Sequence, residues 1–103
     1  MNQSDLELKH ALDKFETLIN DLPDNRTSVP KFKNFVVYFL RIKPKKVTLP
    51  TAELMAVLKH EKPTVFYYMR SDSSQHMIFN LVTHIDMKYE TAVERLENVK
   101  QQL

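Results

Sequence analysis

The chain of 103 residues contains no glycine, and this absence constrains its fold more than any other feature of its composition. Glycine is the residue that most readily adopts the positive φ angles of tight hairpin turns and helix C-caps. Glycine-rich phosphate loops and nucleophile elbows also depend on it, so neither is expected. The composition therefore predicts an all-α protein whose helices are joined by proline, asparagine and aspartate.

A single compact domain is expected, because the chain lies at the lower end of the usual range of roughly 100–200 residues. There is no cysteine, which excludes disulfides and thiolate metal sites. The longest apolar run, Phe35–Leu40, has six residues, whereas a membrane-spanning helix needs about 20. Residues 1–22 carry acidic side chains where a signal peptide would be basic and apolar. We therefore expect a cytoplasmic protein.

Apolar residues recur every three or four positions through the first 70 residues, which is typical of amphipathic helices. Ser4 is expected to cap the first helix and Thr51 the third, since both can accept a hydrogen bond from a free N–H group. Prolines mark the other boundaries, because proline suits the first turn of a helix and disfavours its continuation. The predicted helices cover residues 4–22, 30–44, a short stretch from 51, and 63–70.

The C-terminal apolar residues follow a heptad pattern, with spacings that alternate between four and three. A helix over residues 76–103 would span about 42 Å, longer than a globule of this size, which is roughly 33 Å across. Its apolar stripe would then need a partner: the first helix, a second copy, or another protein. Ala92 lies within the stripe, and the expected interface residues are Ile78, Val82, Ile85, Tyr89, Leu96, Val99 and Leu103.

One alternative to helices is a small β wing. Val65–Met69 and Met77–Val82 are rich in β-branched and aromatic residues, and the polar residues 71–75 could connect them as a hairpin. The lack of glycine for a tight turn favours helices here.

The net charge of +2 conceals a basic centre between two acidic ends. Residues 26–75 hold ten basic and three acidic residues, and the seven basic residues from Arg26 to Lys46 are interrupted by no acid. Such a block concentrates positive potential and suits a polyanionic partner. A solvated helix face with a charged linker is the alternative interpretation.

The segment Glu53–Arg70, ELMAVLKHEKPTVFYYMR, resembles the helix-turn-helix of small bacterial DNA-binding proteins. The family prefers glycine in the turn, where Lys59 stands here, and an apolar residue and a small cap where His60 and Glu61 stand. The resemblance covers 18 of the 103 residues. The matching residues are Glu53, Leu54, Leu58, Lys62, Pro63, Thr64 and Val65, with Tyr68 at the apolar position that closes the motif.

This resemblance implies two helices at a steep angle, with Leu54, Leu58, Val65 and Tyr68 pointing inward. It also implies a small regulator or replication accessory factor of bacterial or mobile-element origin that contacts duplex DNA more than single strands. The expected organisation is one domain over 1–103, with an N-terminal helix in 1–22, a basic core containing the motif in 30–70, and the heptad helix in 76–103. The expected nucleic-acid-binding residues are Lys31, Lys33, Arg41, Lys43, Lys45, Lys46, Lys59, Lys62, Thr64, Phe66, Tyr67 and Arg70.

The same residues allow a second mode of nucleic-acid binding. Aromatic side chains at positions 66–68 alternate with nearby cations and could stack on unpaired bases, as in single-strand binders. Tyr68 is expected in the core, and Phe66 and Tyr67 cannot both be buried with it on a regular helix. At least one of them should therefore be exposed.

A rival function is that of an adaptor subunit that docks on a larger nucleic-acid enzyme through the heptad helix and exposed aromatics. A regulator should be a homodimer, whereas an adaptor should form a heterocomplex. Residues 71–76 contain the residue types of a catalytic triad, but consecutive positions in a polar loop do not give its geometry. His76, His84 and Asp86 match no recognised metal spacing. We therefore expect no enzyme activity, catalytic residues, metal or cofactor.

Overall fold

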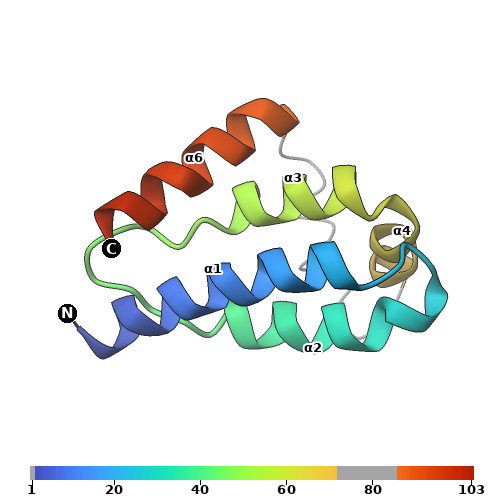
Figure 1. The fold of residues 1–103 in the computed structure, drawn as a ribbon, viewed down its shortest axis with the longest axis horizontal. Helices are drawn as coiled ribbons and strands as arrows, with labels where there is room; N and C mark the ends of the chain where they lie inside the picture. The colour runs from blue at the N-terminus through green and yellow to red at the C-terminus, as the bar shows by residue number, and fades with distance from the viewer. Residues whose placement is uncertain (1, 72–85) are drawn as a thin grey trace.

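The computed structural model describes residues 2–71 and 86–103. Within these ranges every regular element is helical, which confirms the all-α prediction. The alternative of a β wing is wrong for its first strand, because Val65–Met69 lies inside a helix. The second strand, Met77–Val82, lies outside the described residues. The elements are α1 (Gln3–Asp21), the short 3-10 helix η1 (Arg26–Ser28), α2 (Val29–Phe39), α3 (Thr51–Glu61), α4 (Pro63–Ser71) and α6 (Tyr89–Gln102) (Figure 1).

The helices lie mostly along the long axis of a molecule that measures 36 × 27 × 24 Å. In Figure 1, α2 runs antiparallel to α1, α3 returns in the direction of α1, and α6 lies against α3. Both chain ends and the loop between α2 and α3 lie at one end of the molecule, and α4 lies at the opposite end. Residues close together in the basic centre of the sequence are therefore divided between two distant ends.

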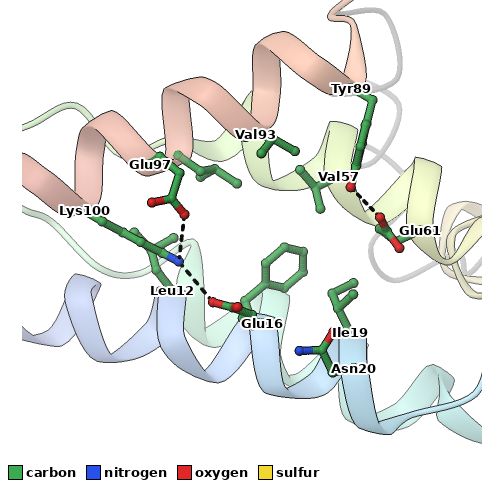
Figure 2. A pocket seen from close by; sticks show the side chains of 12 residues that line it. Leu12, Glu16, Ile19, Asn20, Val57, Glu61, Tyr89, Val93, Glu97 and Lys100 are labelled. Atoms are coloured by element: carbon green, nitrogen blue, oxygen red, sulfur yellow. Dashed lines mark hydrogen bonds and ion pairs between the residues drawn. The ribbon is translucent and has the colours of Figure 1, made fainter.

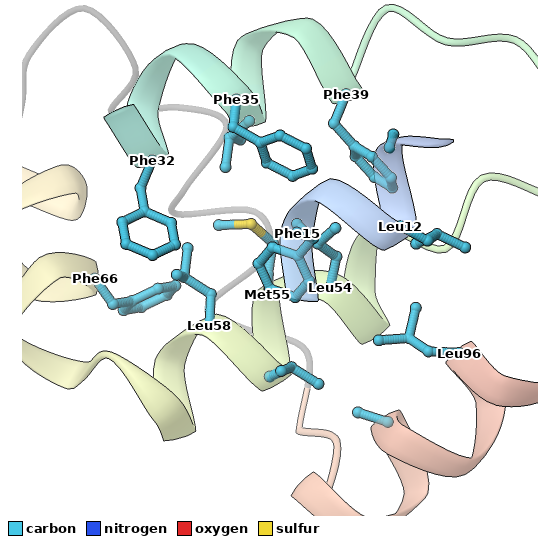
Figure 3. Close-up of a cluster of buried hydrophobic side chains, with 14 of the residues drawn as sticks. Leu12, Phe15, Phe32, Phe35, Phe39, Leu54, Met55, Leu58, Phe66 and Leu96 are labelled. Atoms are coloured by element: carbon cyan, nitrogen blue, oxygen red, sulfur yellow. The ribbon is translucent and has the colours of Figure 1, made fainter. Parts of the chain in front are cut away.

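A phenylalanine-rich cluster forms the core where α1, α2 and α3 meet (Figure 3). The rings of Phe15 and Phe35 stack with centroids 5.7 Å apart, and those of Phe35 and Phe39 with centroids 6.0 Å apart. The periodicity predicted these buried faces correctly. From α1 and α2 the buried apolar residues are Leu8, Ala11, Leu12, Phe15, Phe32, Phe35, Val36 and Phe39.

Two predicted helix caps are wrong. Asn2, not Ser4, caps α1, because the Asn2 Oδ1 accepts a hydrogen bond from the Ser4 N–H at 2.9 Å. Thr51 is the first residue of α3, and the N-cap position is taken by Pro50, with no side-chain cap. Both errors are shifts of one or two residues, and they leave the helices where the pattern placed them.

The second helix is shorter than predicted. It ends at Phe39 rather than near Pro44, and the Ile42 N–H bonds to the Phe39 carbonyl, three residues back. Pro44 has no N–H and disfavours helical geometry at Lys43, so it prevents continuation of the helix beyond that point. The chain leaves the helix before this, through a tightened turn in which the N–H groups of Arg41 and Ile42 bond to carbonyls three residues back.

Asp5 fastens the loop that follows α2 to the first turn of α1. Its side chain is buried, and its Oδ1 accepts hydrogen bonds from the backbone N–H groups of Lys45 at 2.7 Å and Lys46 at 3.1 Å. The bond from Lys46 is the main cause that lowers the pKa of Asp5 below its ordinary value, and the burial of the carboxyl opposes this. The lysine side chains at these positions remain exposed.

The prediction of one continuous helix over residues 76–103 is wrong, because residues 86–88 lie outside any helix and α6 has only 14 residues. Lys88 is extended, with φ −68° and ψ 146°. Tyr89, the first residue of α6, holds the start of this helix against α3. Its ring stacks on His60 with centroids 3.9 Å apart, and its hydroxyl donates to the Glu61 carboxylate at 2.5 Å. That hydrogen bond, more than burial, raises the pKa of Tyr89. At about 21 Å, α6 does not overhang the domain.

Candidate nucleic-acid interface

The helical pair α3 and α4 forms the centre of the candidate interface. In Figure 1, α3 lies in the plane of the picture and α4 is seen end-on, so the two helices cross steeply, as expected. Leu54, Leu58 and Val65 are all fully buried. Their burial matches the inward positions that the resemblance implies for these residues.

The connection within this pair differs from the expected turn. Lys59 was expected in the turn, but α3 continues through it to Glu61, and Lys62 alone separates the two helices. Pro63 forces the break there, because it restricts the preceding residue to extended geometry. Lys62 has φ −133° and ψ 64°, and no described residue has a positive φ. The missing glycine therefore causes no strain.

The exposed and buried faces of α4 also differ from expectation. Phe66, expected to point outward, is 4% exposed, and Tyr68, expected in the core, is 37% exposed. Figure 3 shows Phe66 pointing into the core toward Phe32 and Leu58. Met69, fully buried, lies one turn after Val65 and occupies the inward position instead. Tyr67 is 63% exposed, so the expectation of one exposed aromatic holds.

A carboxylate from a distant segment closes the N-terminus of α4. The Asp24 side chain accepts hydrogen bonds from the backbone N–H groups of Thr64 at 3.1 Å and Val65 at 3.0 Å. A negative charge is favourable at this end of a helix, where the N–H groups have no partner within the helix. The N–H groups of Thr64 and Val65 are therefore already hydrogen-bonded within the protein.

Two tyrosines and an arginine form a second feature of this end, which we call the tyrosine face: Arg26, Tyr67 and Tyr68. The Arg26 guanidinium carbon lies 5.1 Å from the centroid of the Tyr68 ring, and the two tyrosine rings meet edge to face at 5.5 Å. A hollow of about 390 Å³ opens beside them, lined by Arg26, Val29, Pro30, Tyr68 and Ser71. The face exists because α4 packs against η1 and α2.

The predicted cationic residues separate into two groups. At the end of the molecule opposite α4, the loop after α2 carries Arg41, Lys43, Lys45 and Lys46, all exposed. Around α4, Lys33 and Lys62 are half-buried and the other predicted cations are exposed, as is Thr64. The elements at this end carry Lys31 and Lys33 at the start of α2, Lys59 and Lys62 at the end of α3, and Arg70 in α4, to which the structure adds Arg26 in η1. Lys31 lines a separate hollow with Lys14, Leu18 and Tyr38, between α1 and α2.

The expected partner interface on the heptad stripe lies against the protein's own core where the structure describes it. Leu96 is 8% exposed, and Tyr89, Val99 and Leu103 are partly buried against the same cluster. Of the partners considered for the stripe, the chain's own helices cover these four residues, with α3 rather than α1 as the main one. Ile78, Val82 and Ile85 lie outside the described residues.

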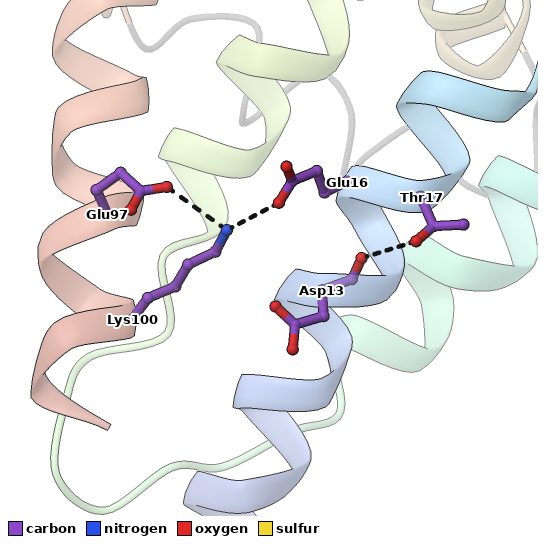
Figure 4. A network of polar contacts seen from close by, with 5 residues as sticks. All are labelled: Asp13, Glu16, Thr17, Glu97 and Lys100. Atoms are coloured by element: carbon purple, nitrogen blue, oxygen red, sulfur yellow. Dashed lines mark hydrogen bonds and ion pairs between the residues drawn. The ribbon is translucent and has the colours of Figure 1, made fainter.

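A groove between α1 and α6 is the other notable hollow, with a volume of about 240 Å³ (Figure 2). Lys100 spans it at one end, 3.2 Å from a carboxylate oxygen of Glu16 and 3.6 Å from one of Glu97 (Figure 4). Glu61, bonded to Tyr89, lies at the other end. Three carboxylates against one ammonium give this rim the wrong sign for a nucleic acid.

The described residues contain no cluster of three side chains that could hold a metal ion. None of the helices in this part of the chain combines the length and hydrophobicity that crossing a membrane requires.

No protein-family model matches the chain, and neither the curated proteins nor the solved structures gave a match.

Proposed function

We propose that this protein binds nucleic acid through the end of the molecule formed by α4, η1 and the start of α2. The observation that carries the proposal is the tyrosine face, on which two exposed aromatic rings lie beside an arginine. Exposed aromatic rings within a cationic surface are the combination that nucleic-acid-binding proteins use: cations for phosphates, and rings for bases or sugars.

The charges around this end support the proposal. Lys31, Lys59 and Arg70 have exposed side chains, and Lys62 is half-buried between α3 and α4. Phosphate contacts from such side chains supply most non-specific affinity and make it depend on salt. Given the helix-turn-helix resemblance, the role we propose is that of a small transcription regulator or replication accessory factor of bacterial or mobile-element origin.

The double substitution Lys62→Ala with Arg70→Ala tests this proposal. It should weaken binding of a fluorescent oligonucleotide about tenfold or more and reduce the slope of log affinity against log salt by about two. Fluorescence anisotropy at about 50 mM and about 200 mM salt measures both quantities. Thermal unfolding of the variant should match that of the parent protein.

The pair Lys43→Ala with Lys46→Ala is the matched control, because it removes the same charge from the opposite end of the molecule. Its affinity should fall far less. An equal loss in both pairs would contradict an interface at the α4 end. If the parent protein binds neither duplex nor single strands, the proposal fails and the adaptor function becomes the better one.

A further inference from the structure

The geometry points to a single-stranded nucleic acid as the preferred ligand of this end, with unpaired bases stacked on the tyrosine face. The inference rests on the proposed function and adds the class of nucleic acid to it. It reverses the preference for duplex DNA that the helix-turn-helix resemblance implies.

The first step is that Asp24 already caps the N-terminus of α4. A recognition helix contacts base edges with its N-terminal residues while it lies in the major groove. Here the Asp24 carboxylate lies within 3.1 Å of the backbone nitrogens of Thr64 and Val65. Insertion of this end into a groove would bring that negative charge close to two rows of phosphates. This arrangement disfavours duplex binding at the residues that would have to contact the base edges.

The second step is the side of α4 that remains available. Phe66, one of the predicted contact residues, is buried in the core, while Tyr67 is 63% exposed. In a duplex, each base is already stacked between its neighbours, so a protein ring reaches a base face only after unstacking it. In a single strand the faces are accessible, and stacking on an aromatic ring contributes to affinity with every base type.

The third step is the position of the cation. The Arg26 guanidinium lies over the Tyr68 ring, and this contact favours a position beside the hollow. A guanidinium held in this way can donate to a phosphate or stack on a base next to the one on Tyr67. The α4 end thus combines a ring for a base with a neighbouring cation for the backbone.

A strand-preference titration with Tyr67→Ala tests the inference. The probes are a fluorescent oligothymidylate and the same strand paired with oligoadenylate. The parent protein should bind the single strand more tightly, and Tyr67→Ala should weaken that binding about tenfold or more, with little change for the duplex. Tyr67→Phe should keep most of the affinity, since it keeps the ring.

Tyr38→Ala is the control, since Tyr38 is an exposed tyrosine of α2 that is not part of the tyrosine face. It should leave single-strand affinity unchanged. Tighter binding to the duplex, or equal affinity of the parent and Tyr67→Ala for the single strand, would overturn the inference while the proposed function stands. Absence of binding to both probes would overturn the proposed function itself.

Discussion

Substitution of Ala92 by aspartate is expected to lower the free energy of unfolding by several kcal/mol. Ala92 is fully buried, and its helix α6 packs on α3. Aspartate is too short to extend its charge to solvent, so the carboxylate must be buried unpaired or α6 must leave α3. Chemical denaturation followed by circular dichroism measures the effect.

Val93→Asp provides a matched control, because the next residue of the same helix is 37% exposed. Alanine has a higher helix propensity than valine, which accounts for up to about 0.7 kcal/mol of the difference between the two variants, and burial accounts for the rest. The control should cost less than Ala92→Asp, because Val93 lies at the groove and a charge there can reach solvent. Equal losses would mean that α6 does not pack through Ala92, and the heptad stripe would again be a candidate interface for another chain.

Substitution of Phe32 by alanine should destabilise the protein by about 3–5 kcal/mol. Phe32 is fully buried and belongs to the core cluster that joins α2 to α3 and α4. A domain of this size has a total stability of about 5–15 kcal/mol, so this loss is a large share of it. Because α4 rests on this cluster, the tyrosine face should lose its geometry as the protein unfolds.

Tyr38→Ala removes an aromatic ring from the same helix at a position that is 42% exposed. Its effect on the urea midpoint should be smaller than that of Phe32→Ala, since Tyr38 loses less buried surface than the fully buried Phe32. A Phe32→Ala midpoint close to that of Tyr38→Ala would place Phe32 outside the core and would contradict the packing of α2 against α4.

Sequence periodicity was sufficient to predict most of the core. A helix that packs on one side repeats its buried residues every three or four positions, and Leu8, Phe15, Phe32 and Phe35 all follow this rule. The absence of glycine correctly favoured helices over strands. These predictions succeeded because they depend on local geometry that any packed helix must satisfy.

The candidate site was harder to predict, because its defining contacts join distant positions. Asp24 caps a helix that begins about forty residues later, and Arg26 lies over Tyr68. No spacing rule connects such pairs. Phe66 and Tyr68 are both large and aromatic, so the residue types did not reveal which of them is buried. Phe66 is buried because it points toward Phe32 of α2 and Leu58 of α3.

The C-terminal heptad shows a further limit. Spacing alone predicted one helix over residues 76–103, but a regular apolar repeat does not reveal that residues 86–88 leave the helix. The start at Tyr89 depends on contacts with His60 and Glu61 on another helix. The packing partner of the stripe, α3, was also not among the candidates that the sequence suggested.

The most direct test of the interface is to map backbone amide chemical shifts during titration with oligothymidylate. We predict that the largest shift changes occur in η1, the first turn of α2 and α4, around Arg26 and Tyr67. The loop over residues 40–50, at the opposite end of the molecule, should change little. Large changes confined to that loop, with α4 unaffected, would contradict the interface described above.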